Sequence, residues 1–587
     1  MFLYKGVRMK RLWPIGIFIG VLVVGVWTQA LDLGGAYQRA KGAASSAYER
    51  ASSAASSAVE SVRGAATSTY TKMSEAATSA KEYVTGYISD SVKSLIKSQQ
   101  EAIINNPYKD TVATVRVGNQ LHPEEHAYLA KRKPKVKAAL EKMLSRSLDG
   151  KYVPNIAIVG SGGGYRAMLG TIGSLLAAEK IGLLDATTYI TALSGATWAL
   201  GPWVSTGMSL TAFKNYIKKN VVTNIHVDSV REAKNIANTL SVKVAYDEPI
   251  TIVDIYGGLL SNRLLSHFGD NNQRIYLSQQ ADRIRNADIP FPIYTAIDAR
   301  EAVAHEPHWF EFNPYEIGAP YYGAYIPTWG YGRQCLGGKT IDFAPEQSLG
   351  FQMGTFGSAF GVHFGRAWDE IVEKIPGTII KGAVEAKLID PNSGKRVTTF
   401  WAEVFNFMYG MAGQELIARP TLKLVDAGID FNLPYPPVSG ERPERKADLM
   451  VFLDFSGGSL LYTLKKTEAY ARKRGLKFPT IDYTDIDKKA LSIFRDENDP
   501  SVPVILYFPR ISDVALWEAN KSKREFFAYR SIEGFDFDRC QAGGYCDTPN
   551  FQYTLQQSEK LIDQMEFNIV ANKDKIIEMI NWVIDQK

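Results

Sequence analysis

Three consecutive glycines, Gly162, Gly163 and Gly164, stand between a strand-like and a helix-like stretch of the sequence. The preceding residues 155–160, NIAIVG, form a short apolar run that ends in glycine, as buried strands do. Residues 165–184 have the apolar spacing of a helix. This order predicts a strand, a tight turn and a helix of an α/β fold, in which the turn amides and the helix dipole attract a negative oxygen. Arg166 would hold a second negative oxygen.

A glycine-rich turn between a strand and a helix can also bind a nucleotide. The segment GSGGGYRA lacks the Lys-Ser/Thr of a phosphate loop, and its glycines do not have the dinucleotide spacing. The formal net charge is only +5 and no dense lysine and arginine stripe occurs, which argues against a nucleic-acid partner. No cysteine and histidine spacing typical of zinc is found, so no metal site is expected.

Two further segments carry groups suited to ester chemistry. The β-prone run TTYITAL (187–193) precedes SGATWALG, so Ser194 lies at a sharp strand-to-helix turn, which can expose a nucleophile. LKLV (422–425) predicts a strand that ends at Asp426, where a carboxylate can accept the serine proton. Ordinary roles remain open, since serine favours helix N-caps and Asp-x-Gly is common in turns.

Six motifs, taken together and in order, resemble a known family. They are GSGGGYRAM (160–168), ALSGATW (192–198), FEFNPYEIG (310–318), GSAFG (357–361), VDAGIDFNLPYPP (425–437) and DLMVFLDFS (448–456). This pattern is similar to the catalytic domain of the cytosolic (group IV) phospholipase A2 family. The spelling GGGYRAML also resembles secreted fungal phospholipase B enzymes, which are lysophospholipases. The resemblance extends over residues 106–587.

The resemblance implies a layered, hydrolase-like α/β domain of the patatin or phospholipase type with a central mixed sheet. It also implies hydrolysis of fatty-acyl esters of glycerophospholipids or lysophospholipids through an acyl-serine intermediate. Acyl transfer to an alcohol and lipid-surface binding without catalysis are the alternatives. Asn432 is expected near the site, without an assigned role. The implied roles are nucleophile for Ser194, general base for Asp426, oxyanion hole for Gly162, Gly163 and Gly164, and phosphate binding for Arg166.

Calcium is not expected to be required, and no cofactor is expected. The family's calcium-dependent lipid-binding domain would precede the catalytic part, and no β-rich stretch lies there. No acidic loop resembles an EF-hand.

Residues 1–30 predict a signal peptide or a membrane anchor. Basic residues precede the apolar run 12–27, and TQA follows with small residues at the spacing that a signal peptidase prefers. The run is short for a bilayer span, which takes about 20 residues. We therefore expect an exported or secreted protein, with anchoring through the apolar segment as the alternative.

Residues 31–105 contain an eleven-residue repeat whose units begin at Tyr37, Tyr48, Val59, Tyr70, Lys81 and Val92. Mostly apolar residues occupy positions 1, 4, 7, 8 and 11 of each unit, which fall within an arc of roughly 120° on a helix. This predicts a long amphipathic helix whose alanine-rich face with interfacial tyrosines suits a lipid surface. A solvated spacer and self-association are the alternatives.

Two features remain open. Residues 308–332 are dense in aromatic residues, glycine and proline, so they are either aromatic core with tight turns or the wall or lid of an acyl-chain funnel. Cys540 and Cys546 could pair around a short loop in an exported chain, or remain two ordinary thiols.

Overall fold

The computed structural model describes residues 99–300, 307–360, 388, 401–413, 418–541 and 543–587. The chain divides into two compact units, Met1–Ile88 and Ser89–Lys587, and all described residues belong to the second. The predicted signal or anchor (1–30) and the eleven-residue repeats up to residue 98 lie outside the described residues. Residues 99–104, at the end of the predicted amphipathic segment, are helical.

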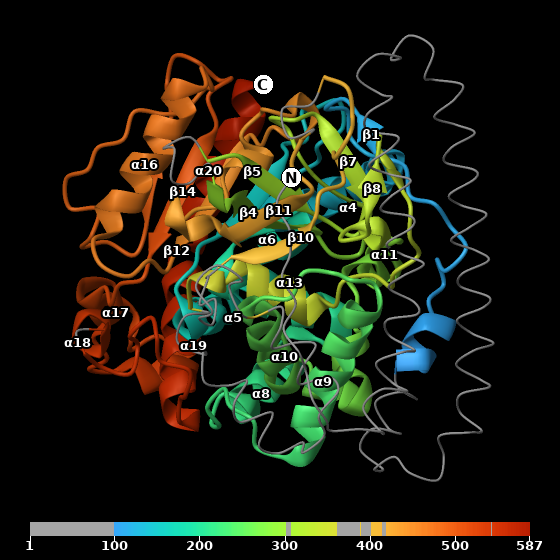
Figure 1. Cartoon of the computed structure of the whole chain (residues 1–587). Helices are drawn as coiled ribbons and strands as arrows, with labels where there is room; N and C mark the ends of the chain where they lie inside the picture. Colours follow the sequence, from blue (N-terminus) through green and yellow to red (C-terminus); the bar gives the residue numbers. More distant parts are fainter. Residues whose placement is uncertain (1–98, 301–306, 361–387, 389–400, 414–417, 542) are drawn as a thin grey trace, which may run out of the picture. The chain divides into compact units, whose positions relative to one another are not determined.

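A mixed twelve-stranded sheet forms the centre of this unit, which confirms the predicted fold class (Figure 1). Five neighbouring strands run parallel in the order β4-β3-β2-β12-β14, and antiparallel strands extend the sheet on both sides. The three central strands of this order are buried along their whole length, so both faces of the sheet are covered. The strands are β1 (Arg116–Val117), β2 (Ile156–Gly160), β3 (Tyr189–Ala192), β4 (Phe291–Asp298), β5 (Trp309–Phe312), β6 (Glu316–Ala319), β7 (Ala324–Pro327), β10 (Ala402–Phe405), β11 (Thr421–Asp426), β12 (Leu449–Asp454), β13 (Ser492–Phe494) and β14 (Val504–Pro509), with a separate pair β8 (Cys335–Leu336) and β9 (Lys339–Thr340).

Helices connect and cover these strands. The crossover from β2 to β3 contains α5, which packs against α7 and against α19 near the end of the chain. Figure 1 shows α5 beside α19. The described helices are α4 (Pro123–Leu144), α5 (Gly164–Lys180), α6 (Leu183–Ala186), α7 (Ser194–Thr206), α8 (Leu210–Asn220), α9 (Val230–Ala245), α10 (Ile252–Leu264), α11 (Gln280–Ile284), α13 (Leu349–Phe356), α16 (Leu460–Lys473), α17 (Val514–Asn520), α18 (Phe537–Gln541), α19 (Leu555–Val570) and α20 (Lys573–Gln586). No helix of the described ranges has both the length and the apolar character needed to cross a bilayer.

One edge of β4 is shared by two strands that approach each other end to end. Parallel β3 pairs with the first half of β4 and ends where Ala192 faces Tyr294. Antiparallel β11 pairs with the second half and ends where Asp426 faces Ala296. Because β5 also pairs with Ala296 and Ile297, β11 must occupy the same edge as β3. The two strand ends are therefore two residues apart along β4, roughly 7 Å.

The aromatic segment 308–332 is part of the core. It forms β5, β6 and β7, which add antiparallel strands to the sheet beside β4. Phe310, Phe312 and Tyr325 are almost completely buried. Aromatic core with tight turns is therefore the interpretation that the structure supports for this part of the segment, because these side chains are buried within the fold.

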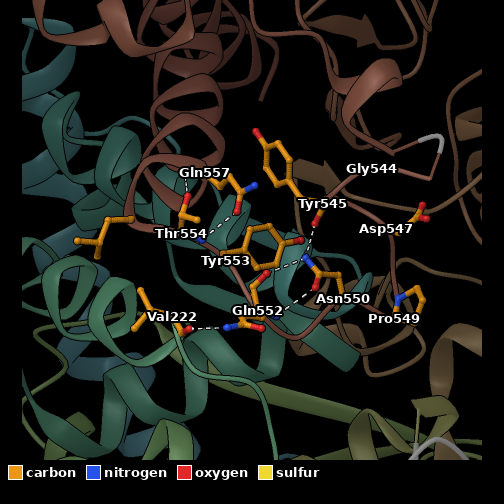
Figure 2. Close-up of a pocket in the computed structure, with 11 residues that line it drawn as sticks. Val222, Gly544, Tyr545, Asp547, Pro549, Asn550, Gln552, Tyr553, Thr554 and Gln557 are labelled. Atoms are coloured by element: carbon orange, nitrogen blue, oxygen red, sulfur yellow. Dashed lines mark hydrogen bonds between the residues drawn. The ribbon is translucent and has the colours of Figure 1, made fainter.

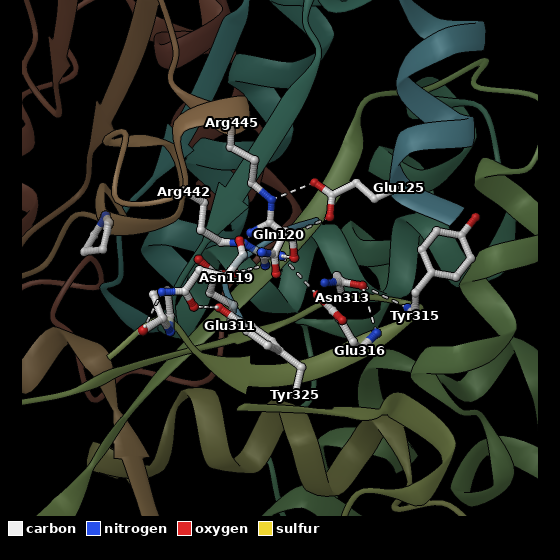
Figure 3. A network of polar contacts seen from close by, with 12 residues as sticks. Asn119, Gln120, Glu125, Glu311, Asn313, Tyr315, Glu316, Tyr325, Arg442 and Arg445 are labelled. Atoms are coloured by element: carbon white, nitrogen blue, oxygen red, sulfur yellow. Dashed lines mark hydrogen bonds and ion pairs between the residues drawn. The ribbon is translucent and has the colours of Figure 1, made fainter. Parts of the chain in front are cut away.

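A buried ionic network joins these strands to α4 and to the short turn Pro443–Arg445 (Figure 3). Arg445 donates to both carboxylate oxygens of Glu125, at 2.6 and 2.7 Å. Arg442 donates to Glu311 at 3.0 Å and to Glu316 at 3.2 Å. These guanidinium and carboxylate groups are almost completely buried, and the pairing with Arg445 holds the pKa of Glu125 below its ordinary value although burial acts to raise it. Each buried charge is thus paired by a partner from another element.

Candidate active site

Ser194 follows the end of β3 and is the first residue of α7. Its φ of 46° lies in the left-handed region that a residue with a side chain rarely adopts. Such local strain is held only where the surrounding structure enforces it, and it is typical of the turn that presents a nucleophilic serine. The backbone of Ser194 does not serve as the N-cap, which is Leu193, so the ordinary role as an N-cap is excluded.

The triple-glycine turn, residues 162–164, lies directly against this serine. It follows β2, the parallel neighbour of β3, so both turns emerge at the same edge of the sheet. A Cβ atom on Gly162 would lie 2.7 Å from Cβ of Ser194, and one on Gly195 would lie 2.1 Å from the carbonyl oxygen of Gly164. Neither position has room for a side chain, and Gly163 and Gly164 also have positive φ values of 141° and 62°. Glycine is required here for contact between the two turns.

The amides of this turn differ in what they bind. The Gly162 N–H donates to Oδ1 of Asn432 at 3.0 Å. Gly163 is the N-cap of α5 and Gly164 is its first residue. Amides at the start of a helix have no carbonyl partner within the helix and are available to an anion.

Asp426 ends β11 and is almost completely buried. Its Oδ1 accepts the Gly428 N–H at 2.9 Å. The Ser194 side chain lies close enough to Asp426 to act on its pKa. Burial raises the pKa of Asp426 to about 7, although the Gly428 N–H and the Ser194 side chain act to lower it. The pair predicted from the sequence is thus together, with a carboxylate that is a stronger base than an exposed one.

Arg166 is buried and binds the loop that precedes α19. Its Nε donates to the Phe455 carbonyl at 2.9 Å, and its Nη1 donates to the Cys546 carbonyl at 2.6 Å and to the Thr548 hydroxyl at 3.1 Å. Burial lowers the pKa of Arg166 to about 10, so the group stays charged at neutral pH. Its Nη2 is buried without a hydrogen-bond partner among the described residues and lies against Gly163.

The loop that holds Arg166 is closed by a disulfide between Cys540 and Cys546. On its other side lies a cavity of about 710 Å³ lined by residues of 544–557 and by Val222 (Figure 2). Tyr545, Asp547 and Pro549 face this cavity, whereas the intervening Cys546 and Thr548 bind Arg166. Arg166, Ser194 and Asp426 are not among the residues that line the cavity.

Contacts from distant segments hold the site together, and the sequence did not reveal them. The Ser358 hydroxyl accepts the Asp426 N–H at 3.1 Å. Asn432, expected near the site without a role, binds Gly162 and the Ser456 hydroxyl. The motifs GSAFG and DLMVFLDFS contain Ser358 and Ser456. These motifs indicated that the two segments belong to the family pattern, but not that these serines bind Asp426 and Asn432. Among the described residues, no three His, Cys, Asp or Glu side chains gather to hold a metal ion.

The profile of the family described as the lysophospholipase catalytic domain matches residues 156–465, which include the triple glycine, Arg166, Ser194 and Asp426. The chain belongs to this family. Among its relatives is mouse cytosolic phospholipase A2 epsilon, 28% identical over 555 residues, which cover 82% of this chain and 62% of the relative. Human cytosolic phospholipase A2 zeta is also 28% identical, covering 80% of this chain and 62% of the relative. The chain thus spans less than two thirds of the length of these relatives.

Solved structures agree with this family fold. Human GIVD cytosolic phospholipase A2 superimposes with a TM-score of 0.66 at 24% identity, covering 81% of this chain and 68% of that chain. The same human protein in complex with methyl gamma-linolenyl fluorophosphonate gives a TM-score of 0.63 at 25% identity, covering 81% and 66%. The resemblance to the cytosolic phospholipase A2 family and the phospholipase-type fold are confirmed.

The prediction of an exported, secreted or N-terminally anchored protein is contradicted. The relatives of this lysophospholipase-family chain are named cytosolic phospholipases A2. Basic residues before an apolar run of sixteen residues were the basis of the prediction, and such a run is shorter than the about 20 residues of a membrane span. The prediction relied on this short pattern, which is weaker evidence than relatives matched over most of the chain.

Proposed function

We propose that the protein hydrolyses fatty-acyl esters of glycerophospholipids or lysophospholipids through Ser194 and Asp426. The observation that carries the proposal is the strained serine that lies next to a buried carboxylate and against the triple-glycine turn. A nucleophile, a base and an oxyanion site are the groups that acyl transfer to water requires. The family supplies the substrate class, since the relatives are phospholipases.

In the proposed reaction, Asp426 takes the hydroxyl proton as Oγ of Ser194 attacks the acyl carbonyl carbon. The carbonyl oxygen becomes an oxyanion next to the amides of Gly163 and Gly164, while the Gly162 amide would have to release Asn432 to contribute. Collapse of this intermediate expels the alcohol, which takes the proton from Asp426. Water then attacks the acyl-serine with Asp426 again as base. Collapse of the second intermediate breaks the bond between Oγ and the acyl carbon, Asp426 returns the proton to Oγ of Ser194, and the fatty acid leaves.

Arg166 suits the phosphate of such a substrate. Three of its hydrogen bonds fix the guanidinium against protein groups, and the buried Nη2 beside Gly163 has none among the described residues. A phosphate oxygen at Nη2 would satisfy a donor that costs free energy when it stays unpaired. Because phospholipids reside in lipid surfaces, we also propose that the protein works at such a surface.

A fluorophosphonate probe and a labelled phospholipid test the proposal. Wild-type protein should release free fatty acid, and peptide mapping should find the probe on Ser194. The Ser194→Ala variant should lose both labelling and hydrolysis, with a drop in kcat of roughly 10⁴-fold or more. Labelling at another serine, or an unchanged rate in the variant, would disprove the assignment. Acyl transfer would appear as an acylated acceptor, and catalytically silent binding as lipid association without product.

We further propose that calcium is not required, because the serine, the carboxylate and the amides supply attack, proton transfer and charge stabilisation. Hydrolysis of a phospholipid dispersed in detergent micelles should have the same rate in excess chelator and in millimolar calcium. A rate that falls on chelation and returns when calcium is added back would contradict this prediction.

A further inference from the structure

Asn432 forms a two-way bond with the triple-glycine turn. Its Oδ1 accepts the Gly162 N–H at 3.0 Å, and its Nδ2 donates to the Gly162 carbonyl at 3.0 Å. Because an N–H can only donate and a carbonyl can only accept, these partners fix which amide atom faces which group. The side chain thus binds one residue of the turn on both sides, as a neighbouring strand would.

Asn432 also lies close to Gly428, the residue whose N–H binds Asp426. A Cβ atom on Gly428 would lie 2.9 Å from Oδ1 of Asn432 and 3.1 Å from Oδ1 of Asp426, so both oxygens lie beside the same glycine. Gly162 in turn lies against Ser194. One amide group therefore joins the segment that carries the base to the turn that faces the nucleophile.

A second layer of groups holds Asn432. Its Nδ2 also donates to the Ser456 hydroxyl at 2.8 Å, and this hydroxyl donates to the buried Asp454. The Ser456 N–H donates to the same carboxylate at 2.9 Å, and Tyr507 donates to its other oxygen at 2.7 Å. These bonds anchor Asn432 to the end of β12, at the centre of the sheet.

We propose that Asn432 is a positioning residue that sets the triple-glycine turn relative to Ser194 and Asp426, a role that rests on the proposed function. Only a neutral amide fits this place. An aspartate could accept from Gly162 but could not donate to its carbonyl, and its charge would lie near Asp426. A like charge disfavours ionisation, so the pKa of Asp426 would rise. Alanine would remove the bonds without adding charge.

Two variants separate these effects. In Asn432→Ala, kcat on a short-chain phosphatidylcholine should fall on the order of 10²-fold, the cost of misplacing reacting groups, while KM stays within about twofold. The pH at which its activity rises should stay at the wild-type value. In Asn432→Asp, the rise should shift to higher pH by roughly one unit or more, because ionised Asp426 is the base. Ser456→Ala, which loosens Asn432, should lower kcat by roughly 2- to 10-fold.

Asn406→Asp is the matched control. Asn406 also bonds the backbone on both sides, donating to Arg419 and accepting from Met408, but it lies beyond the end of β11 that is far from Asp426. This variant should lose thermal stability and keep the wild-type kcat and pH profile of the folded protein. If the Asn432 variants behave like this control, or if Asn432→Asp leaves the pH profile unchanged, the positioning role is wrong.

The rate of fluorophosphonate labelling at Ser194 keeps this test independent of the substrate. Wild-type protein that is labelled but does not cleave phosphatidylcholine would disprove the proposed function. The labelling rates would still decide the role of Asn432, since they should fall in Asn432→Ala and stay unchanged in Asn406→Asp. Equal labelling rates in all three proteins would overturn it.

Discussion

Burial gives Asp426 a pKa of about 7. An ordinary aspartate, with a pKa near 4, would be a weaker base. A buried base of this kind accepts a proton more readily and needs no histidine to do so. The Ser194 side chain lies next to this carboxylate and acts to lower its pKa, but burial has the larger effect.

The first prediction concerns pH. Because Asp426 must be ionised to accept the proton, kcat/KM should rise as the pH passes through about 7 and level off above it. Initial rates from pH 5 to 9 on a substrate without titratable groups in this range would measure the profile. A rate that is already at its plateau at pH 5 would contradict the shifted pKa.

The raised pKa of Asp426 also predicts that the Asp426→Asn variant is more stable than wild type at high pH. The variant should be inactive, because asparagine cannot act as the base. The folded protein retains the Asp426 proton up to about pH 7, whereas the unfolded chain releases it near pH 4. Stability contributed by the protonated group is therefore present below pH 4 and is lost as the pH rises through 7. At pH 8 the buried charge costs on the order of 2–4 kcal/mol, which asparagine would avoid.

Urea unfolding of Asp426→Asn and wild type at pH 4 and pH 8 checks this prediction. The free energy of unfolding of Asp426→Asn should exceed that of wild type at pH 8, and the two should be equal at pH 4. Ser194→Ala keeps the carboxylate and should therefore retain most of the wild-type dependence of stability on pH. Equal stabilities of Asp426→Asn and wild type at both pH values would count against an ionised, desolvated Asp426.

Much of the site could be predicted from the sequence at this scale, because residue type and local pattern carry the information. Ser194 and Asp426 each end a strand-like run, and the glycines mark a turn that needs no side chains. The roles of Asn432, Ser358 and Ser456 could not be predicted, because each depends on a contact with a residue far away in the chain.

At the scale of elements, the site is the contact between the starts of two helices. Helices α5 and α7 begin at neighbouring strand ends, and Gly195 lets the backbone of α7 approach Gly164. The close approach places the first amides of α5 in front of the first side chain of α7. Glycine is therefore needed at these positions because it lets the two helix ends come close, and not only because it makes the chain flexible.

Gly195→Ala and Gly201→Ala, both within α7, test this contact. A methyl group at 195 would lie 2.1 Å from a backbone oxygen, so we expect a loss of about 1–3 kcal/mol of stability and slower labelling of Ser194. At 201 the nearest atom is 3.6 Å away, so alanine should be neutral or stabilise the helix by about 0.5–1 kcal/mol. Thermal unfolding and labelling rates measure both. Similar behaviour of the two variants would contradict the steric argument.

Elements were predictable where they are short, buried and bounded by turn residues. The runs ending at Gly160, at Leu193 and at Asp426 are close to β2, β3 and β11. Pairing between strands was not predictable, since the end-to-end arrangement of β3 and β11 along β4 depends on residues far apart in the sequence. The sequence of residues 308–332 was compatible with an aromatic core and with the wall or lid of an acyl-chain funnel, and only the burial of its side chains favoured the core.

At the scale of the whole molecule, the buried ionic network fastens α4 and the turn at residues 443–445 to the sheet. Arg445→Met should cost about 3–5 kcal/mol, because it leaves Glu125 buried without its main partner. Arg472→Met removes an exposed pair with Glu468 on α16 and should cost less than about 1 kcal/mol. Denaturant unfolding measures the free energy of unfolding of both variants. Equal losses would contradict the expected difference between the buried and the exposed ion pair.

The arrangement of β3 and β11 along one edge of β4 has a consequence for synthesis. The serine turn leaves the ribosome more than 200 residues before the strand that carries its carboxylate partner. Ser194 and Asp426 can therefore come together only after β11 has been synthesised and has paired with β4.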